Sequence, residues 1–182
     1  MTLGTTLGTI LNETKKQSTS QIIREKLKKE LGLSNRDVSV KTSRGGYESA
    51  VRVKVKSSKA LKVLGKIEHI ADDLEKVDYD ERTGEILAGG NTFVFVDIDY
   101  DLEKKLREKI QDEFESVRDE FESGKNVKLF KTFEVNHTST TPYVAVKKTM
   151  QPLRGGLDNV GSAILGLISI AKDDSLYGVI VK

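Results

Sequence analysis

The chain contains no cysteine and no tryptophan, and it has only two prolines and two histidines among its 182 residues. The absence of cysteine excludes disulfides and thiolate metal sites, and it fits a reducing compartment such as the cytoplasm of a bacterial host cell. The longest apolar stretch, residues 163–171, is interrupted by Gly166 and Ser169 and is far shorter than the ~20 residues that a membrane span needs. Residues 1–11 lack a basic start followed by an apolar run, so we expect neither a signal peptide nor a membrane partner.

The composition is that of a small globular protein. A length of 182 residues predicts one domain or two small ones. The hydrophobic fraction of 37% is modest beside the charged fraction of 32%, but valine, isoleucine and leucine are plentiful enough to build a core.

The net charge of +2 conceals a strong segregation of charge along the chain. Residues 1–66 carry 15 Lys and Arg against 5 Asp and Glu, whereas residues 67–123 carry 7 against 19. Residues 124–182 are mildly basic again, with 8 against 4. If the segregation persists in the fold, the molecule has one basic and one acidic surface.

The first half of the chain predicts the order helix, strand, strand, helix, strand. Serines before residue 21 offer N-caps to the first helix, and Gly32 stands where that helix ends. Alternating apolar and basic residues on both sides of Gly45 and Gly46 predict a β-hairpin with one wet, basic face. The run after Asn91 is almost continuously apolar, which is typical of a central strand. The expected elements are a helix over 20–31, strands over 38–41 and 50–55, a helix over 58–74 and a strand over 92–99.

The second half predicts a similar order. Asp101 is expected to cap a long helix whose apolar residues recur every three or four positions as far as Gly124. The further expected elements are strands over 127–135 and 143–146, a helix over 159–171 and a strand over 177–181.

These patterns predict an α+β fold with mixed or antiparallel sheets and helices packed on one face of each. Residues 1–17 show no periodicity, so we expect a flexible N-terminal arm. Residues 18–100 and 101–182 both follow the order α-β-β-α-β. They form either two such units in tandem or one compact domain with a single mixed sheet.

The motifs of common enzyme classes are absent. No glycine is followed by the Lys-Ser/Thr pair of a phosphate-binding loop, and no serine lies in a Gly-x-Ser-x-Gly elbow. With no cysteine and two histidines, few catalytic triads can be built. We therefore expect a protein that is not an enzyme and that needs no cofactor.

Two groups of side chains have a spacing that occurs in metal sites. His69 has Asp72 and Asp73 three and four residues on, a spacing that can bind a metal but is more often a solvated helix face. Asp97, Asp99 and Asp101 alternate at the end of a strand, and carboxylates on one strand face can hold Mg²⁺, as in many nucleases. No Glu-x-Lys partner stands out for them, so we prefer the interpretation that they end a strand and cap the next helix. We therefore predict no metal site.

The charges indicate two candidate binding surfaces. Lys and Arg on rigid elements at a surface are what contacts to phosphate groups require, and Tyr47 in the hairpin turn could stack on a base. A dense acidic helix can imitate the phosphates of DNA, although either surface can equally be an ordinary solvated one. The candidate residues of the basic face are Arg24, Lys28, Lys41, Arg44, Tyr47, Arg52 and Lys54, and those of the acidic helix are Asp112, Glu113, Glu115, Asp119 and Glu120.

One segment resembles a known family. Residues 83–96 read TGEILAGGNTFVFV, and they follow a helix at 22–31 and a strand at 38–40. This arrangement is similar to a small domain of phage, plasmid and conjugative-element proteins, from the group called large polyvalent protein-associated domains. The resemblance covers residues 18–100 and identifies no catalytic residue.

A free-standing copy of such a domain in so short a chain is similar to an anti-CRISPR protein of type II systems. The resemblance implies an inhibitor that binds an RNA-guided type II nuclease and blocks DNA cleavage, with the acidic helix in the nuclease channel or the basic face on guide RNA or DNA. The alternatives are a nucleic-acid-binding accessory module of a mobile element and, third, a metal-dependent nuclease built on Asp97 and Asp99.

Overall fold

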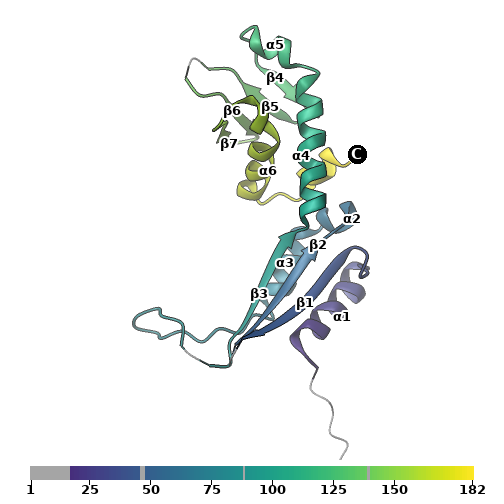
Figure 1. Ribbon diagram of the computed structural model, residues 1–182, viewed down its shortest axis with the longest axis vertical. Helices are drawn as coiled ribbons and strands as arrows, with labels where there is room; N and C mark the ends of the chain where they lie inside the picture. The colour runs from purple at the N-terminus through teal and green to yellow at the C-terminus, as the bar shows by residue number, and fades with distance from the viewer. Residues whose placement is uncertain (1–16, 46–47, 88, 139) are drawn as a thin grey trace, which may run out of the picture.

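Figure 1 shows an elongated molecule with two sheets, one above the other in this view, each accompanied by helices. The computed structural model describes residues 17–45, 48–87, 89–138 and 140–182. One sheet has three strands in the order β1-β2-β3, and the other has four in the order β4-β5-β6-β7. The expected α+β class is confirmed. None of the helices in the described ranges is long and apolar enough to cross a membrane.

The first half follows the predicted order, except that its second helix is interrupted. Val63 has a φ of −131°, which breaks the helix expected over 58–74 into two pieces. The elements are α1 (Thr19–Leu31), β1 (Val38–Gly45), β2 (Glu48–Val55), α2 (Ser58–Leu61), α3 (Leu64–Asp72) and β3 (Thr92–Ile98).

The second half departs from the predicted order, so a tandem pair of α-β-β-α-β units is wrong. The long helix breaks at Ser116 and Val117, and four short strands replace the two expected between the helices. The elements are α4 (Tyr100–Glu115), α5 (Arg118–Glu122), β4 (Val127–Leu129), β5 (Phe133–Asn136), β6 (Tyr143–Val146), β7 (Thr149–Pro152), the 3-10 turn η1 (Leu157–Asn159), α6 (Val160–Ala171) and α7 (Ser175–Ile180).

Local signals explain where α1 begins and ends. The backbone N–H of Ser18 donates to the side chain of Gln21 at 2.9 Å, which satisfies one donor at the start of the helix. Gly32 ends the helix with a φ of 63°, a left-handed conformation that glycine adopts without steric cost. The N–H groups of Gly32 and Leu33 then bond back to the last turn at 3.1 Å each.

The first sheet buries one face under helices. β1 pairs with β2 antiparallel, and β2 pairs with β3 in parallel through the crossover that contains α2 and α3. The valines of β1 and β2 alternate with polar residues and lie on the buried face, which α1 and α3 cover. These buried valines are Val38, Val40, Val51, Val53 and Val55.

The prediction that residues 92–99 form a central strand is wrong, because β2 lies in the middle and β3 forms an edge. Val94 faces the helices, whereas Phe95 is 43% exposed on the other side. The run is nearly continuously apolar because both of its faces carry apolar side chains, although only one face is packed by helices.

The second sheet is an antiparallel meander packed against α6, and α6 packs against α4. Gly161 permits the close approach of these helices, since a Cβ atom there would lie 2.9 Å from the carbonyl oxygen of Arg107. Figure 1 shows α4 running along the upper half directly from the end of β3.

Two strand predictions in the second half are wrong. Phe130 and Lys131 adopt positive φ values of 50° and 58°, so residues 127–135 turn back on themselves as the β4–β5 hairpin. Residues 175–180 form the helix α7 because Leu176, Tyr177 and Ile180 recur at helical spacing and are buried where α7 contacts α2 and α4. A short apolar run fits a helix or a strand equally well until its packing partners are known.

Candidate functional site

The helices leave one face of the first sheet uncovered within the described residues. We call this surface the open face. It consists of alternate residues on three strands, namely Ser39, Lys41, Arg52, Lys54, Phe93, Phe95 and Asp97.

The strand register brings basic and aromatic side chains into rows across the open face. Lys41 lies opposite Arg52, and Arg52 lies opposite Phe95. In the next row, Lys54 lies between Ser39 and Asp97. Lys41, Arg52 and Lys54, which the sequence places on the basic face, are therefore brought together and are all exposed.

Two phenylalanines form an aromatic platform beside these cations. The rings of Phe93 and Phe95 are stacked with centroids 6.3 Å apart and planes inclined by 15°. The guanidinium carbon of Arg52 lies 5.3 Å from the centre of the Phe95 ring, within the range of a cation–π contact. The cation and the platform are thus already oriented with respect to each other.

Arg52 also remains available to an anionic ligand. Its Nη1 atom lies 3.9 Å from Oδ2 of Asp97, and both side chains are at least half exposed. An ion pair in such a setting contributes only about 0–1 kcal/mol. A phosphate oxygen can therefore replace the Asp97 carboxylate at small cost.

A shallow hollow of about 410 Å³ lies on the same side of the sheet. Three lysines and Arg52 surround it, so it is positively charged. Its lining residues are Ser39, Lys41, Arg52, Lys54, Lys56 and Asp99. Lys56 thus adds a fourth cation to this side of the sheet.

The other predicted basic residues do not belong to the open face. Arg24 and Lys28 lie on α1, which packs on the opposite side of the sheet, and Arg24 donates a hydrogen bond to the carbonyl oxygen of Val40. Arg44 lines a separate hollow beside the start of α1. Tyr47 lies outside the described residues.

Phe93 and Phe95 were not predicted as site residues from the sequence. Their alternation with Val94 and Val96 was visible, but the whole run was assigned to a buried central strand. Asp97 carried the overlooked signal, because a carboxylate in phase with the two phenylalanines indicates that their face is open to solvent.

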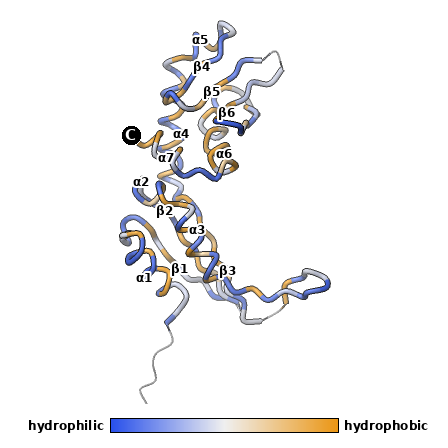
Figure 2. The backbone as a smooth tube through the Cα atoms, turned by 180° about the vertical axis from the view of Figure 1, so that it is seen from behind, coloured by the Kyte–Doolittle hydropathy of each residue, from blue (hydrophilic) through white to orange (hydrophobic). Residues whose placement is uncertain are grey.

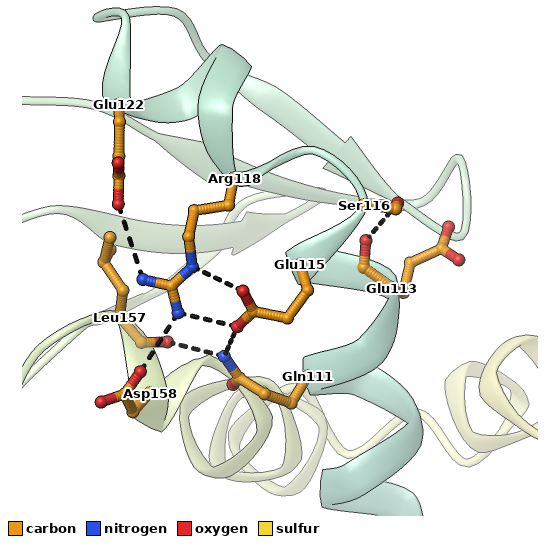
Figure 3. Close-up of polar contacts among 8 residues, drawn as sticks. All are labelled: Gln111, Glu113, Glu115, Ser116, Arg118, Glu122, Leu157 and Asp158. Carbon is orange, nitrogen blue, oxygen red and sulfur yellow. Dashed lines mark hydrogen bonds and ion pairs between the residues drawn. The ribbon is translucent and has the colours of Figure 1, made fainter.

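The predicted acidic helix is two helices, and its carboxylates are partly engaged within the molecule. Figure 3 shows Arg118 of α5 at the centre of these contacts. The Nε and Nη2 atoms of Arg118 donate to Glu115 at 2.6 and 2.7 Å, and Nη2 also reaches Asp158 at 3.1 Å. The bonds that Arg118 donates to Glu115, with a further one from Gln111, lower the pKa of the Glu115 carboxyl to about 2.

Two further predicted acidic residues have internal partners. Oε1 of Glu113 accepts a hydrogen bond from the backbone N–H of Phe130 at 3.2 Å, which fastens the β4–β5 turn to α4. Glu120 lies 3.8 Å from Nζ of Lys125. Asp112 and Asp119 are exposed. Glu113 and Glu115 therefore stabilise the fold, whereas the exposed pair of Glu120 and Lys125 contributes little. The engagement of these two carboxylates weakens the case for an acidic docking helix.

The candidate metal ligands are dispersed. Asp97 pairs with Arg52, and Asp99 caps α4 by accepting a hydrogen bond from the N–H of Asp101 at 3.2 Å. The expected cap, Asp101, is therefore wrong by two residues. The interpretation that a carboxylate at the end of the strand caps the next helix holds for Asp99. His69 is exposed on α3, and no three metal-ligating side chains cluster within the described part of the chain.

Comparison of the chain with protein-family models, with curated proteins and with solved structures finds no match. The resemblance of residues 18–100 to a domain of mobile elements stays a prediction. The geometry of the open face is therefore the feature that indicates a function.

Proposed function

We propose that the protein binds single-stranded nucleic acid with the open face of its first sheet. The observation that carries this proposal is the stacked pair Phe93 and Phe95, with the Arg52 guanidinium over the Phe95 ring and with Lys54 on β2 and Lys41 on β1. Basic side chains that track a phosphate backbone, together with aromatic rings on which bases stack, are the two components of single-strand recognition.

A single strand fits this surface better than a duplex. The phenylalanine rings can stack only on bases that are not already stacked in a double helix. The cations lie on the same face of the sheet as the rings, so one nucleic-acid strand can place its bases on β3 and its phosphates on β2 and β1. We therefore expect weak dependence on base sequence, because every base offers a flat face.

Fluorescence anisotropy with labelled single-stranded and duplex oligonucleotides tests the proposal. The Phe95→Ala variant should bind a single strand roughly tenfold more weakly, since one base–aromatic stack is worth about 1–3 kcal/mol. Tyr100→Ala is the matched control, because Tyr100 is an aromatic residue that is 73% exposed but lies beyond the end of β3. Equal losses in the two variants, or no binding at low salt, would contradict the proposal.

The cations are tested by the salt dependence of the same affinity. Lys54→Ala should reduce the slope of log K against log salt by about 0.7, the value for one lost phosphate contact on a single strand. Lys28→Ala removes the same charge from α1 on the opposite side of the sheet and should leave the slope unchanged. A slope that falls equally in both would indicate a diffuse effect of net charge.

Inhibition of an RNA-guided type II nuclease remains a second proposal, supported by the resemblance of residues 18–100. Of its two docking modes, the engaged carboxylates of Glu113 and Glu115 favour the basic one, in which the open face contacts guide RNA or DNA. A cleavage assay with guide-loaded nuclease tests it. Protection that is lost with Arg52→Ala and kept with Asp112→Asn supports that mode, whereas full cleavage with the native protein contradicts inhibition.

A further inference from the structure

A β-hairpin projects from the sheet between α3 and β3. We call residues 78–87 the projecting hairpin. Figures 1 and 2 both show it extending sideways from the lower end of the sheet, away from the helices. Tyr79 and Ile86 form an antiparallel β-bridge across the hairpin. The N–H of Leu87 donates to the carbonyl oxygen of Asp78 at 2.9 Å.

Buried and turn contacts fix the projecting hairpin in place. Asn91 at its base is only 2% exposed; its side chain accepts from the N–H of Asp78 at 2.9 Å and donates to the carbonyl oxygen of Leu87 at 2.7 Å. At the tip, Oδ1 of Asp80 accepts from the N–H groups of Arg82 and Thr83 at 2.9 and 2.8 Å. A segment ordered in this way loses little conformational entropy when it binds.

The projecting hairpin presents apolar and acidic side chains to solvent. Tyr79, Ile86 and Leu87 are 55%, 50% and 47% exposed, so this short segment holds three of the seven exposed large hydrophobic residues in the described part of the chain. Asp78, Asp80, Glu81 and Glu85 surround them, with Arg82 as the single cation between 78 and 87. A complementary surface must therefore be apolar and positively charged, which excludes nucleic acid.

The open face of the same chain has this character. It offers the exposed ring of Phe95, with Lys41, Arg52 and Lys54 around it. The projecting hairpin points away from the sheet to which it is attached (Figure 1), so it can meet an open face only on another molecule. A second copy of the chain therefore supplies both the positive charge and the apolar area that the hairpin requires of its partner.

We propose that two copies of the protein form a symmetric dimer in which each projecting hairpin lies on the open face of the other copy. Reciprocal exchange uses each contact twice and closes the assembly at two copies. The dimer and a nucleic-acid strand would occupy the same surface, so binding of one displaces the other. The dimer itself does not depend on the proposed function.

Charge exchange between two variants tests the dimer. One variant carries Glu81→Lys and Glu85→Lys on the hairpin, and the other carries Lys41→Glu and Lys54→Glu on the open face. Each variant alone places like charges against each other, so its dimer dissociation constant should rise more than about tenfold. In an equimolar mixture both contacts regain opposite charges, and sedimentation equilibrium should show a heterodimer.

The outcomes of this experiment are unambiguous. A native protein that stays monomeric at every concentration overturns the proposal, as does a mixture that fails to form the heterodimer. Thermal unfolding of each variant checks that the charge changes leave the fold intact. A native dimer that persists in both variants means that another surface joins the copies, which also overturns it.

A second pair of measurements separates the dimer from nucleic-acid binding. Ile86→Ser with Leu87→Ser should dissociate the dimer and leave oligonucleotide affinity equal or tighter, because the open face is no longer occupied. If the variant loses the dimer but neither protein binds an oligonucleotide, the dimer proposal is supported and the proposed function is overturned. If the native protein binds oligonucleotides but forms no dimer, the proposed function is supported and the dimer proposal is overturned.

Discussion

At the scale of the residue, a single hydrogen atom at Gly161 decides how closely two helices pack. An added Cβ atom would lie 2.9 Å from the carbonyl oxygen of Arg107 and 3.0 Å from its Cα atom. Both of these are backbone atoms of α4, so neither can move aside as the end of a flexible side chain can. The helix–helix contact that joins α4 to α6 therefore requires glycine at this position.

We expect Gly161→Ala to lower the free energy of unfolding, because overpacking of a tight contact costs about 1–3 kcal/mol. Gly166→Ala is the matched control in the same helix, since the nearest atom to its added Cβ is a side-chain nitrogen of Gln151 at 4.0 Å. The control should gain up to about 1 kcal/mol from helix propensity. Urea unfolding measures both, and a Gly161→Ala variant as stable as the native protein would contradict the close approach.

At the scale of the element, Asp37 joins the segment before β1 to the start of α2. Its Oδ2 atom accepts from the N–H and the hydroxyl of Ser34 at 2.9 and 2.8 Å, and Oδ1 accepts from the hydroxyl of Ser57 at 2.8 Å. Ser57 in turn caps α2 by accepting from the N–H of Ala60 at 3.2 Å. The bonds from Ser34 and Ser57 lower the pKa of Asp37 to about 2.

This lowered pKa predicts a dependence of stability on acid. Because the pKa of folded Asp37 lies below its ordinary value of 3.8, its contribution is complete above about pH 4 and is lost as the pH falls through 2. Asp37→Asn should cost roughly 1 kcal/mol at pH 7, as is typical of a lost cap, and little at pH 2. Denaturation at both pH values tests this, with Asp112→Asn on the exposed face of α4 as the control.

At the scale of the whole molecule, the two halves meet at a junction that concentrates negative charge. The N–H of Gly65 on α3 donates to Oδ2 of Asp174 at 2.5 Å, and Tyr177 of α7 is buried nearby. Burial and the neighbouring carboxylates of Asp174, Glu68 and Glu103 raise the pKa of Tyr177 to about 12. Burial and the charge of Asp174 likewise raise the pKa of Glu68.

A raised pKa at Glu68 means that its ionised form weakens the junction. The contribution of this group is most favourable below its ordinary pKa of 4.5 and declines as the pH rises through the higher folded value. Glu68→Gln should therefore raise the free energy of unfolding at pH 7 by up to about 0.5 kcal/mol, the scale of a surface substitution.

The same variant should give no gain at pH 4, where Glu68 of the native protein is largely protonated. Unfolding in urea at the two pH values measures the difference. Asp174→Asn is the contrasting variant, because it weakens the bond to Gly65 and should be destabilising at pH 7. A gain from Glu68→Gln that is equal at both pH values would show that charge is not its cause.

Local sequence determined the parts of the fold whose signals lie within a few residues. The serine cap and Gly32 fix the limits of α1, and the alternation around Arg52 and Lys54 fixes which side of β2 faces solvent. These features depend on backbone geometry and on side-chain periodicity, which neighbouring residues specify by themselves. The α+β class follows from them, and so does the placing of three of the six basic candidates, Lys41, Arg52 and Lys54, on the open face.

Tertiary structure decided which of these segments became neighbours. Phe93 and Phe95 join Arg52 only because residues 92–98 pair with β2 as an edge strand, a contact between residues more than 40 positions apart. Residues 175–180 form a helix because α2 and α4 bury Leu176 and Tyr177. Long-range pairing and packing select among conformations that local preference leaves nearly equal in free energy, and in this protein they selected the open face.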